Sequence, residues 1–231
     1  QSTEFMGLMV TIFFMVLTGA LLIMDLDRPD RVLYVLLSPQ WKSWLVRGAY
    51  IITAFGGIVS FKIIDNVFNL NFNWLWYPGS IFSILGAVYT AFLFNQARAR
   101  DFWQTPIQSA FHMLIHAVMA GSVILIIIEP ESLLLMSEIL FIGIIINLII
   151  LFKEIVFYHD TPDTKKTIEL MIKGYYSKYF WIGILLGSIL PICLIVFQME
   201  NLIVVSGLLV LIGIFLTEFV RIRIPQMIPL S

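Results

Sequence analysis

The chain has 231 residues, of which 60% are apolar and only 13% are charged, whereas a soluble domain carries about 25% charged residues. Its 14 Lys and Arg residues nearly balance its 15 Asp and Glu residues, so the sequence offers no strongly basic face for a nucleic acid. The single cysteine, Cys193, excludes a disulfide framework, a cysteine-ligated zinc site and an iron–sulfur cluster held by this chain alone.

Seven apolar runs are long enough to cross a hydrocarbon core of about 30 Å at roughly 1.5 Å per residue. In chain order they lie near residues 5–24, 44–66, 78–97, 107–128, 132–157, 180–198 and 202–221. The runs are continuous rather than alternating, which favours helices over a membrane barrel. The predicted fold class is therefore all-α, a polytopic membrane bundle of about seven transmembrane helices, and we expect a single integral membrane domain over residues 1–231.

The basic residues predict how this bundle is oriented. Every Lys and Arg except Lys62 falls on one face of the seven-span arrangement. By the positive-inside rule, that face is cytoplasmic, with the basic loops and the C-terminus inside and the N-terminus outside. The expected location is the cell (inner) membrane. Lys62 lies toward the other face, three residues before Asp65, and we expect these two side chains to pair.

The polar segment 158–179 is predicted to form an amphipathic surface helix at the headgroup interface. Asp160 or Thr161 is suited to cap it, and Pro162 is suited to its first turn. In the sixth run, Pro191 is expected to kink the helix.

The segment DLDRPDR, residues 25–31, places three carboxylates and two guanidiniums directly after the first run. One interpretation is an ordinary salt-bridged loop. The other is a functional loop in which Asp25, at the membrane edge, takes protons from a polar cluster, because acidic residues at that depth usually have a partner or a task.

Two histidines, His112 and His116, lie four residues apart in the fourth run and so share one helix face. Three interpretations remain open: packing in the core, ligation of a haem, and hydrogen bonding to a quinone carbonyl. A haem with two axial histidines usually takes them from different helices, on opposite sides of the ring. No haem is therefore expected.

Two glutamates lie in the fifth run. Glu138 is about two turns from its negative side, where it is either hydrogen-bonded to a neighbouring helix or a station for proton transfer. Glu154, at the positive-side end, is expected to extend to the membrane interface.

The order of elements resembles the NrfD/polysulfide reductase membrane-subunit family over nearly the whole chain. LLIMDLDRPDRVLYVLLSP (21–39) is similar to that family's acidic–arginine stretch after a span, and SWLVRGAYIITAFGG (43–57) to the opening of its next span. Three further segments resemble later spans of the family: YTAFLFNQARARDFWQTPIQSAFHMLIHAVMAGS (89–122), WIGILLGSILPICL (181–194) and LLVLIGIFLTEFVRIRIPQMIPLS (208–231). The family usually has eight spans, so one more is expected ahead of residue 5 and is missing from this sequence.

The resemblance implies a quinone-reactive anchor subunit of a respiratory oxidoreductase. Such a subunit exchanges electrons between an iron–sulfur (ferredoxin-like) partner and the membrane quinone pool, menaquinone or ubiquinone, and a further catalytic subunit completes the complex. Proton translocation is a further expectation. A haem b-bearing anchor and a secondary transporter or channel are the alternatives.

By the same resemblance, Tyr89 falls at the family's quinone-site tyrosine. Tyr89 and His112 are each about six residues from the positive-side ends of neighbouring spans, hence at one depth of roughly 9 Å, and His116 and Arg31 complete the expected quinone contacts. Asp25 and Glu138 are the expected proton-transfer residues. Asp27, Arg28 and Arg31 are expected to meet the iron–sulfur partner, and lipid surrounds the spans.

Overall fold

The computed structural model describes residues 2–24, 28, 35, 37–97, 100–157, 161–197 and 200–229. These residues form helices and no strand, and seven of the helical segments are long and apolar enough to span a membrane. All seven begin and end within a few residues of the predicted runs, which confirms the all-α membrane bundle.

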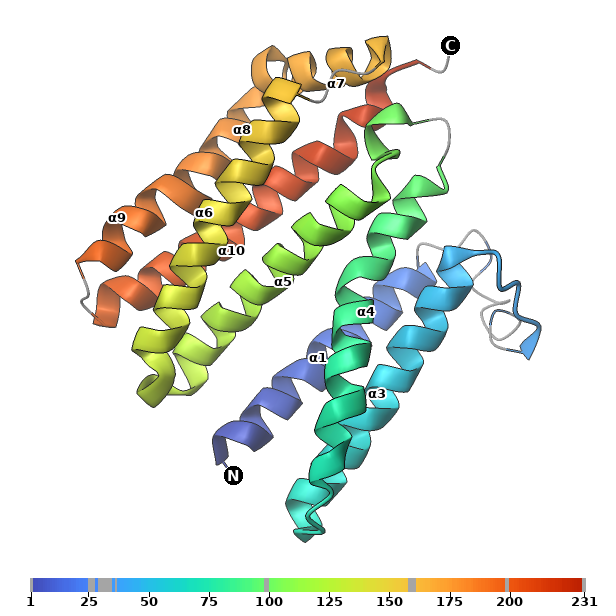
Figure 1. Ribbon diagram of the computed structural model, residues 1–231, viewed down its shortest axis with the longest axis vertical. Helices are drawn as coiled ribbons and strands as arrows, with labels where there is room; N and C mark the ends of the chain where they lie inside the picture. The colour runs from blue at the N-terminus through green and yellow to red at the C-terminus, as the bar shows by residue number, and fades with distance from the viewer. Residues whose placement is uncertain are drawn as a thin grey trace. The chain divides into compact units, whose positions relative to one another are not determined.

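The chain divides into two compact units, Gln1–Gln96 and Ala97–Ser231, each visible as its own group of helices in Figure 1. The expected single domain stays a prediction.

The first unit contains three of the spans, α1 (Ser2–Met24), α3 (Trp44–Phe68) and α4 (Trp76–Asn95). Helix α3 packs against both α1 and α4. Near its start, Gly48 lies so close to the Tyr89 ring of α4 that a Cβ on residue 48 would overlap the ring. The glycine therefore lets the tyrosine pack against the α3 backbone, where its side chain is buried.

At the opposite end of α3, the predicted Lys62–Asp65 pair is confirmed. The Lys62 Nζ lies 2.6 Å from Asp65 Oδ2 and 3.5 Å from Glu4 Oε1 of α1. The second Asp65 oxygen accepts a 2.8 Å hydrogen bond from the backbone N–H of Phe72, in the turn that leads to α4. Lys62 and Asp65 thus connect α1, α3 and the turn before α4 at that end.

The second unit is built around α10 (Glu200–Arg223), which packs against α5 (Pro106–Ile128), α6 (Leu133–Phe157), α8 (Ser177–Ile184) and α9 (Leu190–Val196). Besides Gly143 and Ile150, which are also buried, α6 has seven buried residues that recur every three or four positions: Leu133, Ser137, Leu140, Ile144, Asn147, Leu151 and Glu154. This is the stripe of a helix that buries one face. The stripe is apolar along most of its length and becomes polar toward its C-terminal end.

The sixth span is irregular where Pro191 was expected to disturb it. A π-helical segment, Leu185–Ile189, separates α8 from α9, and Pro191 follows in the first turn of α9. Because proline has no N–H to donate to the preceding turn, the helix widens there. Within this segment Gly187 meets Gly213 of α10, and a Cβ on Gly187 would lie 2.6 Å from the Gly213 Cα.

The predicted surface helix is α7 (Pro162–Lys173), which begins at Pro162 and is capped by Thr161, whose Oγ1 accepts the Thr164 N–H at 3.2 Å. Its buried side, which includes Ile168 and Met171, packs in the apolar cluster of this unit. It ends at Lys173 and is followed by Gly174, so the helix is shorter than the segment 158–179.

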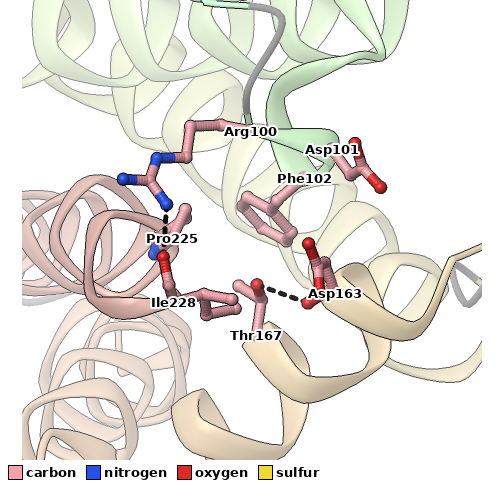
Figure 2. Close-up of a pocket in the computed structure, with 7 residues that line it drawn as sticks. All are labelled: Arg100, Asp101, Phe102, Asp163, Thr167, Pro225 and Ile228. Atoms are coloured by element: carbon pink, nitrogen blue, oxygen red, sulfur yellow. Dashed lines mark hydrogen bonds between the residues drawn. The ribbon is translucent and has the colours of Figure 1, made fainter. Parts of the chain in front are cut away.

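Arg100 binds the segment that follows α10, close to α7. Its Nη1 donates a 2.6 Å hydrogen bond to the Ile228 carbonyl, and a small pocket lies between Arg100, Phe102, Asp163 and Thr167 (Figure 2). The pocket holds about 10 Å³, which is room for about one water molecule and not for a quinone.

Candidate functional site

The second unit contains a cluster of ionisable and amide side chains, of which four are buried and two, both on α10, are partly buried. We call the following six residues the buried cluster: His112 and His116 of α5, Asn147 and Glu154 of α6, and Glu218 and Arg221 of α10. Each helix contributes two side chains three, four or seven residues apart, which is the spacing that places both on one face. On α6, Asn147 lies between Ile144 of one apolar cluster and Leu151 of another.

Asn147 joins the two histidines. Its Oδ1 lies 2.7 Å from the Nε2 of His112 and 3.0 Å from the Nε2 of His116, and the two rings are 4.2 Å apart between centroids. Because an amide oxygen only accepts hydrogen bonds, both Nε2 atoms carry a proton. In a neutral imidazole, the other ring nitrogen, Nδ1, then has a lone pair.

Both Nδ1 atoms face charged groups of α10. Arg221 Nη1 contacts Nδ1 of His112, and because a guanidinium only donates, this nitrogen accepts. His116 Nδ1 lies 3.4 Å from Glu218 Oε1. Neither a lone pair nor a carboxylate oxygen can donate, so a proton on the imidazole or on the carboxyl group would let the two groups form a hydrogen bond. The His116–Glu218 pair is therefore a candidate site for holding a proton.

Arg221 also connects the two glutamates. Its Nη2 lies 3.1 Å from Glu154 Oε1, and its Nη1 lies 3.5 Å from Glu218 Oε1. If both glutamates were ionised, their charge would exceed that of one guanidinium, and a proton on the His116–Glu218 pair would balance it. Glu154 is only 5% exposed, and its second oxygen, Oε2, has no hydrogen-bond partner among the described residues.

The position of Glu154 corrects the prediction from sequence. We expected it to extend to the membrane interface, and that prediction is wrong, because the side chain is buried and paired with Arg221. The reason is its helix face: Glu154 is seven residues, or two turns, beyond Asn147, so it continues the buried stripe of α6. The exposed residue beside it is Lys153.

A metal ion is one group that such side chains can hold. Ligand atoms of His112, His116 and Glu218 all lie within 4.8 Å of one another. However, the Arg221 guanidinium already contacts the His112 nitrogen that would bind the ion and lies beside the same carboxylate. A fixed positive charge at that point opposes a second cation, so the arrangement favours a proton-holding network.

The other predicted site residues have different surroundings. Tyr89 is buried in the first unit against Gly48, and its expected meeting with His112 at one quinone stays a prediction. Glu138 and Arg28 are exposed. Asp25, Asp27 and Arg31 lie outside the described residues.

Sequence reasoning did not assign Glu218 and Arg221 to the site, although their pattern was visible. An acid and a base three residues apart near the end of an apolar span are costly to bury singly and so predict a pair. Their partners on α5 and α6 also come as two polar residues on one face of an apolar helix, which is the same sequence pattern.

The chain is similar to a known protein family. A family model described as polysulphide reductase, NrfD, matches residues 3–229. A search of curated proteins and a search of solved structures each returned no significant match.

Proposed function

Because the chain belongs to the NrfD (polysulphide reductase) family of oxidoreductase membrane subunits, we propose that it reacts with a quinone of the membrane pool, menaquinone or ubiquinone. Electrons pass to or from an iron–sulfur partner subunit, since the single cysteine of this chain cannot ligate a cluster. The substrate chemistry of the complex belongs to a further catalytic subunit.

The observation that supports this proposal is the buried cluster, above all the 3.4 Å approach of the His116 imidazole to the Glu218 carboxyl group, where a proton can be held. Reduction of a quinone takes up two electrons and two protons, and oxidation of a quinol releases them. A subunit that delivers electrons to a quinone therefore needs a group within the membrane that gives and accepts protons. Buried ionisable residues are costly in a bilayer and are typical of such a role.

Tyr89, the two histidines and Arg31 are the proposed quinone contacts, with Asp25 and Glu138 as further proton-transfer residues. Since Asn147 accepts from both Nε2 groups, a quinone carbonyl can bond an imidazole only by displacing this amide. While Asn147 keeps these hydrogen bonds, the histidines therefore contribute to proton transfer, through the contact of His116 with Glu218.

A haem b anchor is the alternative that the cluster opposes. An axial ligand needs an imidazole nitrogen with an available lone pair. In both histidines Nε2 is bonded to Asn147, and the Nδ1 atoms face Arg221 and Glu218.

We propose that the basic loops and the C-terminus lie on the cytoplasmic side.

The test uses the intact oxidoreductase complex with a soluble quinone analogue. We expect Glu218→Gln to lower kcat by about 100-fold, the lower end of what a positioned acid or base contributes, while the partner's iron–sulfur clusters remain present and reducible by dithionite. The matched control is Glu169→Gln, which changes an exposed glutamate of α7 and should leave kcat unchanged. An assembled Glu218→Gln complex with wild-type kcat would remove the cluster from the mechanism.

A further inference from the structure

The first unit contains an open groove that the proposed function does not use. It holds about 440 Å³ at the start of α3, within the range of roughly 300–1,000 Å³ of small-molecule sites. Apart from the Arg47 guanidinium and the Tyr50 hydroxyl, its lining is apolar or aromatic.

The floor of the groove is one face of α3. Trp44, Arg47, Ile51 and Ala54 are spaced by three, four and three residues, which aligns them along the helix. Ten residues of helix rise roughly 15 Å, about half of a hydrocarbon core of about 30 Å. Phe82 of α4 also lines the groove. Its length therefore matches one lipid chain within one leaflet.

One cation, Arg47, lines the start of this groove. The Nε of Arg47 donates a 2.6 Å hydrogen bond to the Trp41 carbonyl, and its guanidinium carbon lies 4.7 Å from the centre of the Trp44 ring. The side chain is exposed, and no carboxylate of the described residues lies within ion-pair distance of it. The Nη groups therefore have hydrogen-bonding capacity for an anion, and a guanidinium is well matched to phosphate oxygens.

Aromatic side chains hold this end of the groove in place. The rings of Trp41 and Tyr50 are 4.8 Å apart, and Trp44 stacks on Phe92 of α4 at 4.5 Å. Gln96 accepts the Trp44 backbone N–H at 2.8 Å and donates to the Lys42 carbonyl at 3.0 Å. Trp and Tyr are typical of the level of lipid headgroups, and a site fixed in advance loses less entropy when it binds.

We propose that this groove binds one acyl chain of an anionic phospholipid, with the lipid phosphate on Arg47. The cation decides the occupant: a quinone headgroup is uncharged and offers nothing to neutralise a guanidinium, whereas a phosphate does so. Lys42, exposed beside the same end of the groove, favours a headgroup with net negative charge over a zwitterionic one. The lipid site is independent of quinone chemistry elsewhere in the chain.

The test measures bound lipid directly. The full chain is exchanged into nanodiscs of equal parts phosphatidylglycerol and phosphatidylcholine and released for native mass spectrometry, which counts the retained lipids of each kind. We expect wild type to retain phosphatidylglycerol in preference by about fivefold, the effect of one basic residue near the surface. Arg47→Gln should lower this preference, and Arg223→Gln, which changes an exposed arginine of α10, should keep it.

A second variant guards against misfolding at residue 47. Ala54→Trp fills the groove without changing charge and should lower retention of both phospholipids, whereas Ile81→Trp, at an exposed position of α4, should not. Three results would overturn the proposal: equal retention of the two phospholipids by wild type, an unchanged preference in Arg47→Gln, or a co-isolated quinone that Ala54→Trp displaces in place of phospholipid.

Discussion

Replacing Arg221 by methionine tests whether the buried cluster is held together by one guanidinium. Arg221 lies 3.1 Å from Glu154 and 3.5 Å from Glu218, and its side chain is only 11% exposed. Methionine keeps much of the packing volume but removes the charge and every donor. Glu154, which is 5% exposed, would then lose its ion-pair partner.

The expected magnitude follows from burial. Removing one partner of a buried ion pair typically costs about 3–5 kcal/mol, because an uncompensated charge remains in a low-dielectric interior. An exposed arginine contributes roughly 0–1 kcal/mol. We therefore expect Arg221→Met to lower the free energy of unfolding by about 3 kcal/mol or more, and Arg223→Met, at an exposed position two residues later, to change it by less than about 1 kcal/mol.

A double-mutant cycle assigns the cost to the pair. Unfolding of the chain in mixed micelles is followed by circular dichroism for wild type, Arg221→Met, Glu154→Gln and the double variant. Since Glu154→Gln removes the charge that Arg221→Met would strand, the double variant should be more stable than the sum of the single effects requires, by about 1–3 kcal/mol. Additive effects, or equal losses for Arg221→Met and Arg223→Met, would refute the assignment of a buried ion pair.

Two further substitutions probe packing and charge in the separate units. Gly187→Ala should lower the free energy of unfolding by about 1–3 kcal/mol, because its Cβ would lie 2.6 Å from the α10 backbone, and micelle unfolding should show little change for Gly86→Ala, where a Cβ meets nothing within 4 Å. Lys62→Met should lower the free energy of unfolding by about 3–5 kcal/mol, because the buried Asp65 would lose its cation. A loss no larger than that caused by Lys166→Met, which changes an exposed lysine of α7, would refute this expectation.

The spans were predictable because a single physical requirement defines them. A helix that crosses the hydrocarbon core must be long and apolar, and both properties are local in the sequence. The Lys62–Asp65 pair and the Thr161 cap were predictable for a similar reason, since each depends on residues three positions apart on one helix. In all these cases the interacting groups are near neighbours in the chain.

The buried cluster was only half predictable, because its second half depends on which helices are neighbours. His112 and His116 could be placed on one face of α5 from their spacing alone. Their pairing with Glu218 and Arg221 requires α5 to pack against α10. Two other spans separate these helices in the sequence. No short turn imposes that contact, so hydrophobic length and loop length carry no information about it.

The misplacement of Glu154 has the same origin and shows what a better prediction requires. A glutamate three residues from the end of a span can reach water along its own helix or point inward, and hydropathy does not distinguish the two. Its helix phase does, because Glu154 continues the stripe of Leu140, Asn147 and Leu151. Once that phase places Asn147 and Glu154 on one face, a single buried glutamate would demand a cation, and Arg221 is the cation that α10 supplies. The cluster thus follows from two properties: helix phase places Glu154 on the buried face of α6, and charge compensation pairs it with Arg221.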